Sequence, residues 1–167
     1  MAARRGKSRP VAAEPERDDA SAPLDLSALH SIVGYPLRRA QLAVFDDFNR
    51  RFASLELSPA QYSTLLAIAA NPGRNQSEIA GALGILRPNF VAMMDELERR
   101  GLAERLRSAA DRRSRALALT TAGRELVARA RRVQGEQEKD IERLVGREGR
   151  EALVAMLRRL MRLEDQS

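Results

Sequence analysis

The feature of this sequence that most constrains its fold is a change of hydrophobic period near residue 102. Before this point the apolar residues recur at steps of three and four, which is typical of amphipathic helices. Over 102–107 and 114–119 the pattern becomes an alternation, which indicates two short, half-buried strands. The polar segment 108–113 between them predicts a hairpin loop, and the helical period returns from Thr121. The chain is therefore predicted to be mainly α-helical with one small β-hairpin.

The predicted helices carry their own start and stop signals. Ser58 and Gln61 have the spacing of a capping box, and so do Asn75 and Glu78. Pro36 interrupts a long apolar stripe and predicts either a kink or a helix that restarts there. The expected helices are 27–54, 58–70, 75–83 and 87–100 before the hairpin, then one from residue 121 and a last one after Gly146.

The order and lengths of these segments predict a winged helix-turn-helix. Helices 75–83 and 87–100 are separated by a tight turn at Gly84, as in DNA-binding helix-turn-helix units, and the charged hairpin would be the wing. The outer helices carry more apolar surface than a small DNA-reading unit could cover, so we expect a homodimer. The predicted organisation is a flexible basic tail over 1–26, an N-terminal dimerisation helix over 27–57, a DNA-binding lobe over 58–120 and C-terminal dimerisation helices over 121–167.

Composition argues against several kinds of function. There is no cysteine and His30 is the only histidine, which excludes disulfides and thiol chemistry and disfavours multi-histidine metal sites. We expect no catalytic residues, no metal and no cofactor. No apolar run reaches the roughly 18–20 residues of a membrane span, so no membrane partner is expected and the predicted location is the cytoplasm.

The charge balance favours an anionic partner. There are 29 basic and 23 acidic residues, a net charge of +6, and nearly all the basic residues are arginine. Arginine pairs well with phosphate and guanine, which points to double-stranded DNA. The alternative is that arginine-rich usage reflects a GC-rich genome and a solvated surface.

Helix 87–100 is the predicted recognition helix, because its inward apolar face leaves the first-turn side chains free to reach base edges in the major groove. Asn89 can pair with adenine through two hydrogen bonds. Val91 and Ala92 can only meet thymine methyl groups or sugars, and Val91 could instead pack on the preceding helix. Five arginines against two acids give the wing a net charge of +3, suited to a narrow minor groove. The predicted DNA contacts are Asn75, Gln76, Arg87, Pro88, Asn89, Val91, Ala92, Arg112, Arg113 and Arg115.

The chain resembles the MarR family of bacterial transcriptional regulators over about residues 28–164. The residues that carry the resemblance are Asn75–Ala80, Leu83–Ile85, Leu97–Leu102, the wing Asp111–Ser114 and the stretch Leu117–Gly123. It implies a dimer with entwined first and last helices, and commonly a repressor released from DNA by a small, often aromatic, ligand. The sequence departs from the common pattern at Val91 and Ala92, where the family has Ser and Arg, and lacks an additional wing Asp.

The resemblance also implies an effector site between the dimer helices and the DNA-binding lobe. The candidate residues are His30, Tyr35, Arg38, Phe45 and Tyr62. The stretch Tyr35–Arg39 supplies an aromatic ring and two cations, which suit a ligand with a carboxylate or phosphate. Because similar family members sense aromatic acids and their coenzyme A thioesters, we hypothesise a hydroxycinnamoyl or benzoyl effector. Phe45 and Tyr62 also suit the core, and His30 a solvent-exposed helix start. The alternative function is a constitutive or architectural DNA-binding protein without an effector.

Overall fold

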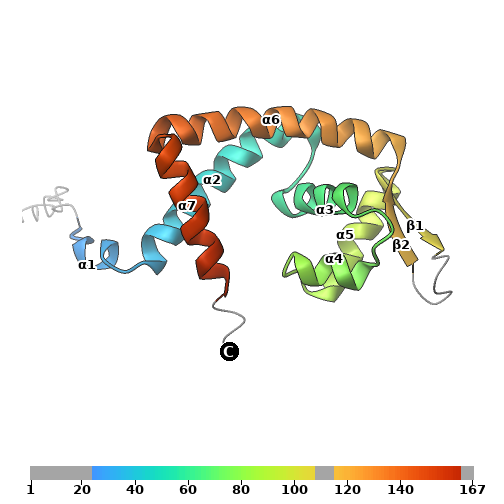
Figure 1. Ribbon diagram of the computed structural model, residues 1–167, viewed down its shortest axis with the longest axis horizontal. Coiled ribbons are helices and arrows are strands. Elements are labelled where there is room, and N and C mark those ends of the chain that lie inside the picture. Colours follow the sequence, from blue (N-terminus) through green and yellow to red (C-terminus); the bar gives the residue numbers. More distant parts are fainter. Residues whose placement is uncertain (1–23, 108–114, 163–167) are drawn as a thin grey trace, which may run out of the picture. The chain divides into compact units, whose positions relative to one another are not determined.

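The computed structural model describes residues 24–107 and 115–162, and the chain divides into two units, 1–37 and 38–167 (Figure 1). The first unit contains α1 (Ser27–His30) and the start of α2 (Gly34–Phe52). The helix is therefore interrupted at 31–33 and restarts at Gly34, which confirms the predicted restart. Pro36 lies in the first turn of α2, where a missing backbone N–H leaves no helical hydrogen bond unmade.

The second unit has the predicted order of helices and one antiparallel hairpin. After α2 the elements are the 3₁₀ turn η1 (Ala53–Leu55), α3 (Pro59–Ala70), α4 (Gln76–Ala82), α5 (Arg87–Arg99), β1 (Ala103–Arg107), β2 (Arg115–Leu119), α6 (Thr121–Val145) and α7 (Arg147–Leu160). In the hairpin Ala103 lies opposite Leu119, and Arg107 opposite Arg115. The fold is thus mainly helical with a two-stranded wing, as predicted. The hairpin loop and most of the predicted tail lie outside the described residues.

Both predicted capping boxes form. The Ser58 hydroxyl accepts from the backbone N–H of Gln61 at 3.2 Å, and the Gln61 side chain accepts from the Ser58 N–H at 3.0 Å. The Asn75 and Glu78 pair repeats this exchange at 3.0 and 2.8 Å. Gly84, with φ of +63°, makes the turn between α4 and α5 in a backbone conformation that glycine adopts most easily. These local signals place the helix-turn-helix where the sequence predicts it.

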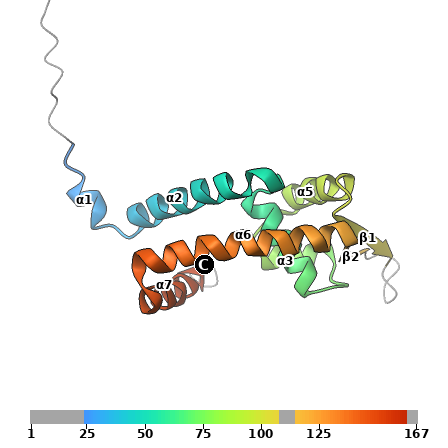
Figure 2. The same cartoon turned by 90° about the horizontal axis from the view of Figure 1, so that it is seen from above.

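An apolar core lies in the second unit, between α3, α4, α5, the hairpin, the end of α2 and the first part of α6 (Figure 1). Phe52 stacks on Phe48 with ring centroids 3.7 Å apart, and Tyr62 lies 5.0 Å from Phe52. The buried residues of α6 all fall between Gly123 and Gln137. The second-unit part of α2 runs beside α6, as Figure 2 shows and the contacts below confirm.

The end of α6 and the whole of α7 contribute no buried residue. α7 contacts α6, yet large apolar side chains on both remain exposed. They are Leu144, Val145, Leu153, Met156 and Leu160. Met161 directly after α7 is exposed too, and α2 adds Leu42, Val44 and Phe45. Among the residues that the structure describes, no helix is both long and apolar enough to cross a membrane.

Candidate nucleic-acid interface

The recognition helix α5 is anchored by three fully buried side chains, Phe90, Met94 and Leu97. Their spacing commits one face of the helix to the core and leaves the opposite face of its first turns outside. Four of the predicted DNA-contact residues lie on that outer face and are exposed: Arg87, Pro88, Asn89 and Ala92. Val91 is half-buried. Their contacts with bases stay predictions.

Asn75 and Gln76, at the start of α4, are both half-buried and both hydrogen-bonded within the lobe. The Asn75 side chain caps α4, and the Asn75 backbone pairs antiparallel with Ala116 of β2. The side-chain Oε1 of Gln76 accepts from Nε of Arg105 at 2.7 Å. If these two side chains contact DNA, they do so through polar atoms that are not used in these hydrogen bonds.

The described part of the wing separates its arginines into two kinds. Arg115 begins β2 and is exposed, as a DNA contact requires. Arg105 is another of the five wing arginines, but it turns inward, and its side chain is only 11% exposed. The alternation of the strands indicates this orientation, because Arg105 lies opposite the fully buried Leu117 and therefore on the same face of the hairpin. The predicted contacts Arg112 and Arg113 lie outside the described residues.

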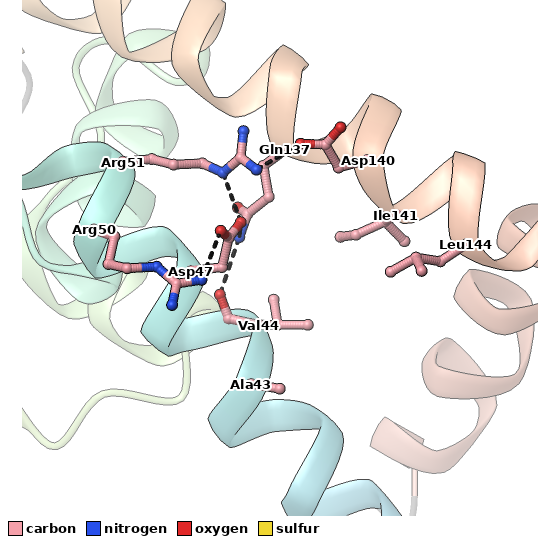
Figure 3. A pocket seen from close by; sticks show the side chains of 9 residues that line it. All are labelled: Ala43, Val44, Asp47, Arg50, Arg51, Gln137, Asp140, Ile141 and Leu144. Carbon is pink, nitrogen blue, oxygen red and sulfur yellow. Dashed lines mark hydrogen bonds and ion pairs between the residues drawn. The ribbon is translucent and has the colours of Figure 1, made fainter.

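A groove between α2 and α6 is lined by apolar residues on one side and by a closed polar network on the other (Figure 3). Arg51 bridges the two helices, with Nε 2.6 Å from Asp47 and Nη2 2.5 Å from Asp140. Buried Gln137 donates to the Val44 carbonyl at 3.0 Å and to Asp47 at 3.1 Å. Arg50 also pairs with Asp47. Arg143 also pairs with Asp140, so three arginines share the two aspartates, and the network joins the two helices.

The network makes the free energy of unfolding depend on pH. The Arg51 guanidinium, with help from Arg50 and Gln137, lowers the pKa of the Asp47 carboxyl below its usual value. A lowered folded-state pKa stabilises the protein above the unfolded-state pKa, and this stabilisation is lost as pH falls through the lowered value. We therefore expect the unfolding free energy to fall below about pH 4, and to fall less steeply in Asp47→Asn. Urea unfolding between pH 3 and 7 would measure this, and equal acid dependence in both proteins would contradict it.

The five predicted effector residues have different surroundings. In the first unit His30 and Tyr35 form an aromatic pair with ring centroids 5.4 Å apart. In the second unit Arg38 and Phe45 are exposed, whereas Tyr62 is buried against Phe48 and Phe52, and burial raises the pKa of its hydroxyl. Tyr62 is thus a core residue, and Phe45 is not. None of the five lines the groove between α2 and α6.

An inward-anchored recognition helix, a preceding capped helix and a two-stranded wing define a winged helix-turn-helix DNA-binding protein. The MarR family model matches residues 55–114. A candidate transcriptional regulatory protein for the hcr operon of Thauera aromatica is 34% identical over 136 residues, which are 81% of this chain and 82% of that protein. The chain therefore belongs to the MarR family of winged-helix transcriptional regulators.

Two solved structures of the transcriptional repressor CouR are also similar to this chain. CouR bound to a 23-mer DNA duplex is 51% identical to this chain, with a TM-score of 0.82. The alignment covers 84% of this chain and 100% of the CouR chain. CouR bound to p-coumaroyl-CoA is 50% identical, covers 84% and 99%, and has a TM-score of 0.78. With the family, these likenesses show that the chain is a DNA-binding transcriptional repressor of the MarR family. No cluster of potential metal ligands occurs within 24–107 and 115–162.

Proposed function

We propose that this protein represses transcription in the cytoplasm as a homodimer on a pseudo-palindromic operator, and that a hydroxycinnamoyl-coenzyme A thioester releases it. The observation that carries the proposal is the likeness to CouR, whose structures were solved with DNA and with p-coumaroyl-CoA. At 51% identity across the whole CouR chain, a shared ligand class is the simplest expectation.

The exposed apolar side chains at the end of α6 and on α7 support the dimer. Leu144 is 85% exposed, Met161 72% and Met156 58% in the single chain. Such a concentration of apolar surface marks a protein interface. A two-fold dimer would place two α5 helices about one DNA turn apart, roughly 34–36 Å, which predicts two half-sites.

The first test is fluorescence anisotropy on the fragment upstream of the protein's own gene and on a scrambled fragment, at about 150 mM salt. A repressor is expected to prefer its operator by a factor on the order of 10³ or more. Equally weak binding to both fragments would instead favour an architectural DNA-binding protein, or an operator elsewhere in the genome.

The second test adds p-coumaroyl-CoA to the preformed operator complex, with free p-coumarate and free coenzyme A as matched controls. We expect the thioester alone to release the DNA, because an effector with both parts can use aromatic and phosphate contacts together. The variant Tyr35→Ala should then require more thioester, while its affinity for DNA stays unchanged. Release by free p-coumarate would identify an aromatic-acid sensor, and no release by any of the three would overturn the proposed effector.

A further inference from the structure

We infer that Arg105 is a positioning residue for operator recognition, which holds α5 in a set orientation to the wing and does not itself contact DNA. The inference rests on the proposed function, since it concerns how an operator is distinguished from other DNA. It begins with burial. Arg105 lies on β1 with its side chain 11% exposed, on the face that carries fully buried Leu117.

The Arg105 guanidinium contacts both helices of the helix-turn-helix. On α4, its Nε donates to the Gln76 side chain at 2.7 Å. On α5, its Nη1 lies 2.8 Å from Oδ1 of Asp95 and also pairs with Glu98, while Nη2 donates to the Val91 carbonyl at 3.4 Å. One side chain therefore ties the first turn of α4 and three successive turns of α5 to the wing.

Glu98 contacts both the backbone and the side chain of Arg105. One carboxylate oxygen accepts from the Arg105 backbone N–H at 2.8 Å, and the other pairs with the guanidinium. Across the hairpin, Leu117 bonds away from β1, since its N–H donates to the Arg74 carbonyl at 2.8 Å. β1 is thus an edge strand at this position, and Glu98 supplies the acceptor that its N–H would otherwise lack within the sheet. Both the strand and its side chain are joined to the last turns of α5.

This arrangement is suited to alignment and poorly suited to a phosphate contact. The donors of Arg105 are directed at four protein groups, two of them carboxylates that neutralise its charge. Contacts with base edges depend on direction, whereas attraction to phosphates depends little on sequence. Loss of the Arg105 contacts should therefore weaken binding to the operator and leave binding to unrelated DNA unchanged.

The decisive variant is Arg105→Lys, which keeps the charge but cannot supply the planar fork of donors. We expect operator affinity to fall about tenfold or more, as for one lost base contact. Affinity for scrambled DNA and the slope of log affinity against log salt should not change, because no phosphate contact is lost. Wild-type operator affinity in this variant, with a salt slope lower by about one in Arg105→Ala, would overturn the inference in favour of a phosphate contact.

Two further variants keep the test decisive. Glu98→Gln removes a negative charge, so simple electrostatics predicts tighter binding to all DNA, whereas the inference predicts a lower operator preference. If circular dichroism shows that Arg105→Lys does not fold, the Glu98→Gln variant alone tests the inference. Arg129→Lys makes the same change at an exposed position of α6, outside the predicted DNA contacts, and should keep the preference. An equal loss there would overturn the inference. A wild-type protein without operator preference would instead refute the proposed function.

Discussion

Replacing Gly123 by alanine should destabilise the protein by about 3 kcal/mol or more, at the upper end of what overpacking costs. Gly123 lies in the first turn of α6, where its N–H donates to the Thr120 hydroxyl at 3.0 Å. An added Cβ would lie 1.9 Å from the Leu102 carbonyl oxygen and 2.9 Å from its carbon. These are backbone atoms at the start of the wing, so no side-chain rotation can relieve the overlap.

Relief requires the hairpin to move away from α6, which would break the bond from the Thr120 N–H to the Leu102 carbonyl. We expect urea unfolding at a fixed protein concentration to report the loss of stability, together with loss of operator binding. Gly81→Ala is the matched control, since a Cβ at this exposed position in α4 meets no atom within 4 Å. It should leave stability unchanged or raise it by up to about 1 kcal/mol. Equal stability of the two variants would contradict the close approach at Gly123.

The adjacent residues Phe90 and Asn89 should respond in opposite ways to alanine. Phe90 is fully buried and anchors α5 in the core, so Phe90→Ala should lower the unfolding free energy by about 3–5 kcal/mol. Asn89 is exposed at the start of the same helix, so Asn89→Ala should leave stability nearly unchanged. It should instead cost about 1–3 kcal/mol of operator affinity, confined to one base pair of each half-site.

Two measurements separate these effects. Urea unfolding gives the stability of each variant, and anisotropy on a set of operators with single substitutions gives the affinity at each base pair. The Asn89 prediction fails if the variant binds every operator as the wild-type protein does. The Phe90 prediction fails if stability falls by less than about 1 kcal/mol, because such a small loss is not expected for a filled core site.

Much of the DNA-binding lobe could be predicted because its signals are local. The capping boxes at Ser58 and Asn75 each join residues three positions apart, and the inward face of α5 follows from helical spacing. The effector residues were harder, because one aromatic pattern suits a core and a ligand site equally. Only the fold shows that Tyr62 is buried against Phe52 while Phe45 is exposed.

The sequence by itself determined the order of helices and strands, the capped starts of α3 and α4, and the outward first turn of α5. These follow from hydrogen bonds and periodicities that join residues within one or two helical turns. Only the tertiary structure decided that the Arg105 side chain binds a partner 29 residues earlier, and that position 123 has no room for a side chain. Both depend on how closely α4, α5, α6 and the wing pack together, and no local sequence pattern encodes that packing.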